Sequence, residues 1–540
     1  MADLATTATS PALAGSILDR KKHAFPSWIT GAIVVVALLG GLVYIGFNIA
    51  GDLQGTTIIS VWPYVLLGVA LLIALGFEFV NGFHDTANAV ATVIYTHSLD
   101  PNIAVVWSGL CNLCGVLVSS GAVAFSVITL LPVELILQVS SGAGFAMVFA
   151  LLIAAILWNL GTWWFGLPAS SSHTMVGSII GVGVANQLMS VHSGTSGVDW
   201  EQATKVFKVL LISPIIGFTA AALLMLLSKA FIKYPALYKA PKDNTPPPWP
   251  IRGLLILTCS GVSFSHGSND GQKGMGLIML ILIGTVPTAY ALNHAVTRND
   301  VAQFIVASDS AGKILDAHVD KHGILGADAR ATVTDYIRTK QLQPDTILAL
   351  RELVEDLSHE VALYKEFKSV PANQQTNVRN DMYVASEALR LMQKNHNPAF
   401  TAQESSTLTA YKSRVDKATK FIPGWVKVAV ALALGCGTMV GWKRIVVTVG
   451  EKIGKEHLTY AQGACAELVA MATISAADNF GLPVSTTHVL SSGVAGTMAA
   501  NRSGLQMSTL RNIAAAWVFT LPVAALLSGT LFYLFRQLAR

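Results

Sequence analysis

Long apolar segments separated by short polar connections make up most of this chain. They lie at 31–50, 64–83, 102–130, 143–165, 174–190, 207–228, 253–266, 275–292, 422–441, 460–480, 487–500 and 513–535. A stretch of about 20 apolar residues is long enough to cross a bilayer as a helix. The pattern predicts an all-α polytopic membrane protein with about 10–12 transmembrane segments.

Some of these segments are too short, or too interrupted by glycine and proline, to be simple spans. Segments 253–266 and 275–292 flank a glycine-rich polar stretch, and segment 174–190 follows Pro168. Interrupted apolar segments are typical of broken helices or re-entrant hairpins that line a polar cavity within a membrane. We therefore expect breaks in the helices at these places.

Charge separates one part of the chain from the rest. Of the 540 residues, 52% are hydrophobic and 12% charged, against about 25% charged in a typical soluble domain, and the mean hydropathy is +0.54. Residues 293–420 hold 32 of the 67 charged side chains, and their apolar residues recur at helical spacing. We expect a soluble helical insertion on the cytoplasmic side, either a passive connector or a regulatory element. The net charge of +5 gives no reason to expect nucleic acid as a partner.

These features divide the chain into six parts. The predicted parts are a tail with an extra transmembrane helix (1–60), a first transmembrane repeat (61–228), a basic proline-rich linker (229–252), the first part of a second repeat (253–292), the insertion (293–420) and the second part of the second repeat (421–540). Arg20, Lys21 and Lys22 precede the first apolar run, which we interpret as an uncleaved helix with its basic flank inside. The Lys/Arg excess of the linker also predicts a cytoplasmic position.

An internal repeat underlies this division. Phe165-Gly-Leu-Pro-Ala-Ser-Ser-Ser-His173 matches Phe480-Gly-Leu-Pro-Val-Ser-Thr-Thr-His488 at an offset of 315 residues. A weaker pair aligns Gly82–Asn88 with Gly267–Lys273 on Asp85 and Asp270, at an offset of 185. The offsets differ by 130, close to the length of the insertion, so both pairs fit one duplication whose second copy is interrupted. Repeated halves with polar breaks are typical of secondary transporters, and we expect the halves to be inverted.

The Pro-x-(Ser/Thr)₃-His motifs carry chemistry suited to an anion. Proline ends one helix and leaves backbone N–H groups at the start of the next, beside several hydroxyls. The candidate substrate-binding residues are Ser170, Ser171, Ser172, Thr174, Ser485, Thr486 and Thr487. The alternative is that these small hydroxyl side chains only pack helices against one another.

Carboxylates within apolar surroundings are costly and mark ion or proton pathways by default. Asp85 and Asp270 are the candidates, with Asn81, Asn88 and Asn269 as neutral oxygen ligands for a cation. A structural salt bridge between Asp270 and Lys273 is the competing interpretation. Glu78 is a relay or a buried structural group, and His173 and His488 are either helix anchors or protonation sites.

At these residues the sequence resembles the inorganic phosphate transporter (PiT) family. That family carries a Gly-Ala-Asn-Asp-Val-Ala-Asn-Ala-like signature in each half, which is present here as Gly82–Ala89 and in altered form as Gly267–Gly274. The altered forms are most similar to those of bacterial low-affinity phosphate permeases. The resemblance implies import of inorganic phosphate across the plasma membrane, the bacterial inner membrane, by cation symport in a homodimer. No cofactor is expected.

Two departures from the signature bear on the coupling ion. His84 replaces its first asparagine, and Lys273 replaces the asparagine that matches Asn88. A lysine ammonium occupies the place of a sodium ion without coordinating one, and histidine titrates near neutral pH. We expect proton coupling in preference to sodium. A divalent metal ion that travels with phosphate stays an open alternative, and no residue is assigned to it as a certain metal ligand.

Two other functions remain as alternatives. Sulfate or another tetrahedral oxyanion is the rival cargo, because some members of the family resemble sulfate permeases. A membrane-embedded phosphate-handling enzyme is the alternative from another class. A nucleophile with its base and electrophile clamp is not expected in near-duplicate in both halves, so the duplication favours transport.

Overall fold

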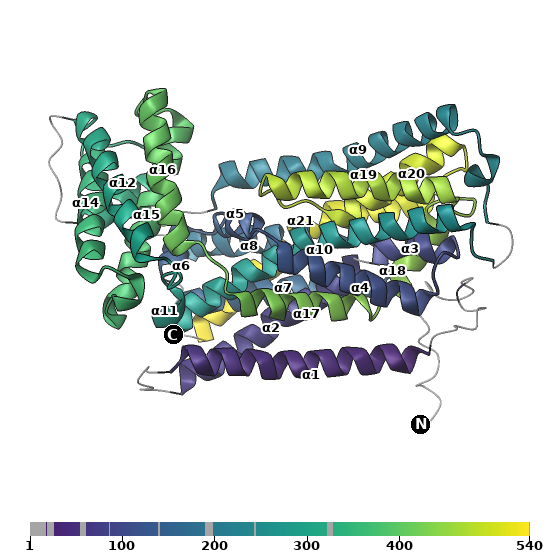
Figure 1. Cartoon of the computed structure of the whole chain (residues 1–540), viewed down its shortest axis with the longest axis horizontal. Helices are drawn as coiled ribbons and strands as arrows, with labels where there is room; N and C mark the ends of the chain where they lie inside the picture. The colour runs from purple at the N-terminus through teal and green to yellow at the C-terminus, as the bar shows by residue number, and fades with distance from the viewer. Residues whose placement is uncertain are drawn as a thin grey trace.

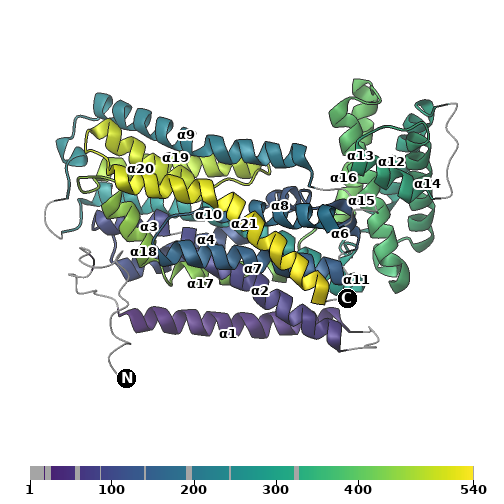
Figure 2. The ribbon, with the colours of Figure 1, turned by 180° about the vertical axis from the view of Figure 1, so that it is seen from behind.

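The structure is a computed structural model that describes residues 18, 26–54, 61–85, 87–138, 141–189, 198–241, 245–320 and 328–538. Within these ranges the chain folds into helices, with one isolated β-bridge between Gly454 and Leu505 in place of any sheet. The helices of the membrane bundle lie side by side along one long axis, as Figures 1 and 2 show from opposite sides.

The helices fall into three groups along the chain. Before the insertion are α1 (Ser27–Asp52), α2 (Trp62–Asp85), α3 (Ala87–Tyr95), α4 (Pro101–Val118), α5 (Ala122–Ile128), α6 (Val133–Leu137), α7 (Gly142–Trp164), α8 (Ser171–Met189), α9 (Trp200–Phe231), the short 3₁₀ helix η2 (Pro235–Tyr238), α10 (Trp249–Thr285) and α11 (Pro287–Tyr290). The insertion holds α12 (Arg298–Ala317), α13 (Ala329–Thr339), α14 (Thr346–Tyr364), η3 (Phe367–Ser369), α15 (Ala372–Asn395) and α16 (Ala402–Thr419). After it come α17 (Gly424–Thr438), α18 (Lys443–Val447), the π-helical turn η4 (Thr448–Lys452), α19 (Tyr460–Asn479), α20 (Thr486–Asn501) and α21 (Met507–Leu538).

Six helices in the described ranges are long and apolar enough to cross a membrane. They are α1, α2 with α3 taken as one span, α4, α7, α9 and α21, and the bent pair α16 and α17 would add a seventh. The expected count of ten to twelve spans is therefore not confirmed. The other apolar runs form helices that carry buried polar side chains, as in α8, α10 and α20, or a helix as short as the 15 residues of α17. Polar side chains that face the inside of the bundle lower the mean hydropathy of their helix.

Helix α10 corrects one expectation from the sequence. The polar stretch between 253–266 and 275–292 does not interrupt the helix, which continues for 37 residues. All residues from Ser265 to Ile283 are buried. The polar side chains of this stretch have hydrogen-bond partners on neighbouring helices. The helix therefore continues through the stretch without a break. The break expected after Pro168 is present, since α7 ends at Trp164 and α8 begins at Ser171.

Glycine allows close crossings between helices that are far apart in sequence. Helix α8 packs along α21, and α20 packs along α9. A Cβ atom at Gly181 would lie 2.0 Å from the carbonyl oxygen of Ala525, and one at Gly496 would lie 2.2 Å from that of Phe218. Backbones approach this closely in membranes where the interface residues are small. Gly181 and Gly496 are separated by the same 315 positions as the two Pro-x-(Ser/Thr)₃-His motifs.

Two further glycine crossings position the aspartates. A Cβ atom at Gly82 of α2 would lie 2.2 Å from the Leu434 carbonyl oxygen of α17. One at Gly267 of α10 would lie 2.1 Å from the Asn112 carbonyl oxygen of α4. In the aligned motifs each glycine precedes its aspartate by three residues. Each aspartate therefore lies about one helical turn after a close contact between two helices.

The insertion helices α12–α16 form a body at one end of the bundle (Figures 1 and 2). Lys340 Nζ lies 2.9 Å from Asp199 Oδ1, and Lys394 Nζ lies 2.5 Å from Glu201 Oε1, at the start of α9. Burial raises the pKa of Asp199, but hydrogen bonds from Lys340 and from the Gln202 amide outweigh it and leave that pKa below its ordinary value. A lowered carboxyl pKa keeps the contact with Lys340 charged until the pH falls through that value.

The glycine crossings predict that Gly181→Ala lowers the free energy of unfolding by about 1–3 kcal/mol, because the new methyl group overlaps the backbone of α21. Thermal unfolding of the detergent-solubilised protein measures this. Gly161→Ala is the matched control, because nothing lies within 4 Å of a Cβ atom there. We expect it to leave stability unchanged or raise it by up to about 1 kcal/mol. Equal losses in the two variants would contradict the close crossing.

Candidate functional site

The two Pro-x-(Ser/Thr)₃-His motifs each form the start of a helix. Ser170 Oγ accepts a hydrogen bond from the His173 backbone N–H at 3.2 Å, and Ser485 Oγ accepts one from the His488 N–H at 3.1 Å. Serine is favoured at such positions because its hydroxyl satisfies an otherwise unpaired N–H of the first turn. Ser170 and Ser485 thus act as matching caps of α8 and α20. The caps fix the first turn of each helix, which carries the hydroxyls that follow.

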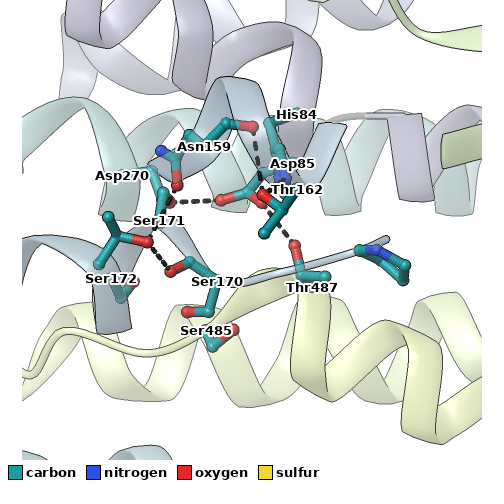
Figure 3. A network of polar contacts seen from close by, with 12 residues as sticks. His84, Asp85, Asn159, Thr162, Ser170, Ser171, Ser172, Asp270, Ser485 and Thr487 are labelled. Carbon is teal, nitrogen blue, oxygen red and sulfur yellow. Dashed lines mark hydrogen bonds and ion pairs between the residues drawn. The ribbon is translucent and has the colours of Figure 1, made fainter. Parts of the chain in front are cut away.

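Asp85 receives hydroxyls from both motifs, as Figure 3 shows. Ser171 Oγ donates a short hydrogen bond to Asp85 Oδ2, and Thr487 Oγ1 donates to Asp85 Oδ1 at 2.6 Å. Ser171 Oγ also lies 3.1 Å from Asp270 Oδ2. One serine hydroxyl is therefore shared by two buried carboxylates that come from α2 and α10. Asp85 and Thr487, which are 402 positions apart in sequence, meet at this point.

Among the described residues, Lys273 is the only lysine or arginine in the cluster. Its Nζ lies 2.6 Å from Asp270 Oδ1 and donates to Ser172 Oγ at 2.5 Å. Ser172 Oγ in turn donates to the Val484 carbonyl oxygen at 2.8 Å, just before α20 begins. The salt bridge weighed as an alternative role for Asp270 is present, and it is continuous with the hydroxyl cluster rather than separate from it.

The remaining polar residues of the aligned motifs have separate partners. His84 Nδ1 lies 3.1 Å from Asp85 Oδ1, and its Nε2 lies 3.1 Å from Thr162 Oγ1. Asn269 Nδ2 donates to the Leu482 carbonyl oxygen at 3.1 Å. Asn88, another of the expected asparagines, belongs to α3, and its side chain lies outside the described part.

Asn81 is directed to Glu78 instead of to an aspartate. Its Nδ2 lies 3.5 Å from Glu78 Oε2. Glu78 is fully buried, and its Oε1 has no hydrogen-bond partner among the described residues. A Cβ atom at Gly274 would lie 2.2 Å from that oxygen, so glycine leaves the room that the carboxyl occupies. Glu78 and Asn81 form a polar pair beside the cluster.

Thr174 and Thr486 are not among the hydroxyls that contact the carboxylates. Thr174 Oγ1 lies 2.9 Å from two acceptors, Asn159 Oδ1 and the Ser170 carbonyl oxygen, and the contact with Asn159 links α8 to α7. Thr486 Oγ1 is buried and has no hydrogen-bond partner in the part of the chain that the structure describes. The rings of His173 and His488 lie 4.4 Å apart between centroids with a tilt of 37°, and His488 stacks on Trp517 at 4.0 Å.

His266 is the residue of the cluster that the sequence reading missed. Its Nε2 lies 3.6 Å from Asp270 Oδ2, and its Nδ1 lies 2.8 Å from Asn112 Oδ1. The spacing of four residues before Asp270, on a helix, was the available signal. Ligand atoms of Asp85, His266 and Asp270 all lie within 4.8 Å of one another and are buried. This set of two carboxylates and one imidazole fits a divalent cation.

The cluster can hold cations and anions in adjacent places. The carboxylates accept hydrogen bonds or bind a cation, while Lys273, the hydroxyls and the N–H groups at the starts of α8 and α20 attract an anion. Complete burial strengthens each of these interactions, because little solvent screens them.

Comparison with known proteins agrees with this chemistry. Residues 81–528 match the family model described as "Phosphate transporter family". The low-affinity inorganic phosphate transporter PitA of Escherichia coli (strain K12) is 42% identical over 493 residues, which cover 88% of this chain and 97% of that protein. PitB of the same strain is 39% identical over 496 residues, covering 89% and 98%. A solved structure of "the sodium-dependent phosphate transporter" covers 88% of this chain and 99% of that chain at 17% identity, with a TM-score of 0.47.

The buried ion pair predicts that Lys273→Met lowers the free energy of unfolding by about 3–5 kcal/mol, because Asp270 loses its counter-charge. The double variant Asp270→Asn/Lys273→Met should recover much of that loss. Lys313→Met, which removes an exposed partner of Asp309, is the control and should change little. Thermal unfolding in detergent gives all three values. A Lys273→Met protein as stable as the parent would show that the pair is not a structural requirement.

Proposed function

Because the chain belongs to the phosphate transporter family, we propose that it imports inorganic phosphate into a bacterial cell by cation symport, with protons favoured over sodium. The family and its named relatives make the chain a phosphate transporter and not an enzyme. Its apolar helices make it a multi-pass membrane protein, consistent with the bacterial inner membrane. A homodimer, which the family resemblance implies, is part of the proposal.

The observation that carries the proposal is the meeting of both polar motifs at Asp85. Ser171 and Thr487 occupy nearly corresponding places in the two motifs, and both donate to this one carboxylate. A transporter with alternating access holds its substrate where its two halves meet, so that either side can open onto the same site. A cluster assembled from both motifs fits that requirement.

The directions of the helices support an inverted repeat. Arg252 Nε at the start of α10 donates to the Ser98 carbonyl oxygen just after α3, at 2.8 Å. Helix α10 therefore begins at the end of the bundle where α2 and α3 finish. The helices that carry Asp85 and Asp270 run in opposite directions, as two inverted copies of one unit would.

We assign phosphate to the hydroxyls of Ser171, Ser172, Thr486 and Thr487 and to the N-terminal turns of α8 and α20. Amides and hydroxyls at the start of a helix bind a tetrahedral anion, and they hold it less tightly than a pair of arginines would. Phosphate carries a proton near neutral pH and can donate it to an aspartate, whereas sulfate has no proton to donate. A site with acceptors among its donors therefore favours phosphate.

The charges of the cluster support a coupling cation. Asp85 and Asp270 contribute two negative charges when ionised, and Lys273 returns one positive charge. One further positive charge would balance the cluster, and a coupling cation supplies it beside the aspartates, where the imidazoles of His84 and His266 also lie. The alternative is a divalent metal ion that enters with phosphate as a co-substrate. Asp85, His266 and Asp270 would be its ligands.

The coupling ion is tested with purified protein in proteoliposomes. We expect an inward proton gradient to drive accumulation of labelled phosphate in the absence of sodium, and a protonophore to abolish it. Excess sulfate should not compete. Accumulation that requires sodium and survives the protonophore would overturn proton coupling, and competition by sulfate would overturn the phosphate assignment. Repeating the assay with and without magnesium shows whether a divalent metal takes part.

The shared hydroxyl is tested by Ser171→Ala. Loss of charge-assisted hydrogen bonds worth about 1.5–3 kcal/mol predicts a roughly 10- to 100-fold fall in the uptake rate per folded protein. Ser491→Ala is the matched control, because Ser491 Oγ is buried without a hydrogen-bond partner in the described ranges. It should stay within about 2-fold of the parent. Equal rates in the two variants would remove Ser171 from the site.

A further inference from the structure

Four connections lie at one end of the membrane bundle (Figure 1). These are residues 96–100, 232–241, 439–459 and 502–506, which we call the basic end. Tyr95 Oη donates to Glu451 Oε1 at 2.6 Å, and Gly454 is bridged to Leu505. With the contact of Arg252 to Ser98, these links hold the connections at the same end of the bundle (Figure 1).

The insertion leaves from the opposite end. Tyr290 Oη donates to Asp52, which joins the end of α1 to α11, and Lys427 Nζ donates to the Ser119 carbonyl oxygen at 2.7 Å, which joins the start of α17 to the end of α4. Helix α10 alone carries the chain from the basic end to the insertion. Its 37 residues give a length of about 55 Å, well beyond the roughly 30 Å of a hydrocarbon core.

The two ends differ in charge. The connections of the basic end hold seven basic residues, Lys233, Lys239, Lys443, Arg444, Lys452, Lys455 and Arg502, against three acidic ones. Arg20, Lys21 and Lys22 precede α1, which starts at this end (Figures 1 and 2). At the other end, the connections 119–138, 198–199, 286–292 and 421–423 hold no Lys or Arg at all. The insertion itself is balanced, with 16 basic and 16 acidic residues.

We propose that the basic end faces the cytoplasm and that the insertion, residues 293–420, lies on the extracytoplasmic side. Lysine and arginine in short connections near the ends of spans are retained on the cytoplasmic side, while acidic residues have little influence. The proposal replaces the cytoplasmic position expected from the sequence. That expectation treated 253–266 and 275–292 as two interrupted segments, whereas one continuous α10 crosses once and puts the insertion on the opposite side from the linker.

This orientation places the salt bridges of the insertion outside. Lys340 and Lys394 then hold the outer domain against Asp199 and Glu201, at the outer end of α9. Since α9 packs along α20, the outer domain is attached to a helix that touches one of the two hydroxyl motifs. Phosphate would arrive from the side that carries the insertion. The inference rests on chain direction and charge, and it holds whichever ion drives transport.

The orientation is tested by cysteine labelling in spheroplasts of a bacterial host. Ala302→Cys lies on exposed α12 of the insertion, and Ala240→Cys lies in the exposed connection at the basic end. The five native cysteines lie in membrane helices, and the parent chain gives their background. A membrane-impermeant maleimide should label Ala302→Cys in intact spheroplasts and label Ala240→Cys only after permeabilisation.

Phosphate uptake by each variant verifies that it is folded, and a permeant maleimide verifies that each cysteine is reactive. Labelling of Ala240→Cys but not Ala302→Cys in intact spheroplasts would overturn the proposal. Labelling of both at equal rates before permeabilisation would also overturn it, because it would show chains in two orientations. Neither outcome would change the assignment of phosphate as cargo, which the uptake assay measures separately.

Discussion

The need to compensate two buried carboxylates governs the arrangement of this protein. Asp85 and Asp270 are almost completely removed from solvent, and an aspartate there is tolerated only with hydrogen bonds or counter-charges close by. No single helix supplies enough of them. Ser171 reaches both aspartates, Thr487 reaches one and Lys273 neutralises the other. The helices that bring these groups together are the ones whose glycines allow the close crossings.

The cluster is asymmetric although its elements are matched. Asp85 is surrounded by hydroxyls and His84, whereas Asp270 is held by Lys273 and lies near His266. Lys273 is part of the chain, so Asp270 has a covalently fixed partner beside it. Around Asp85 the described residues contribute hydroxyls and an imidazole, which makes it the more adaptable place for an exchangeable cation. The two matched motifs thus differ in the groups that lie beside their aspartates.

Sequence reasoning predicted the starts of the hydroxyl-rich helices well and helix continuity poorly. The two prolines followed by hydroxyls predicted the starts of α8 and α20 because proline and serine act through local geometry. The polar stretch of α10 was expected to break its helix, since partners on α4, α8 and α19 are visible only after folding. His266 was missed for the same reason, because its partner Asn112 lies 154 positions away. The six predicted parts of the chain stay a prediction.

The pairing of α8 with α21 also sets a problem of timing during synthesis. Helix α8 ends at Met189, while its partner begins only at Met507, after the whole insertion. At about 5–20 residues per second, a ribosome needs roughly 15–60 s to make the intervening chain. During that interval the serine-rich start of α8 waits in or beside the membrane with its glycine face uncovered. For that interval α8 lacks the helix that covers its glycine face, and a longer insertion would extend the interval.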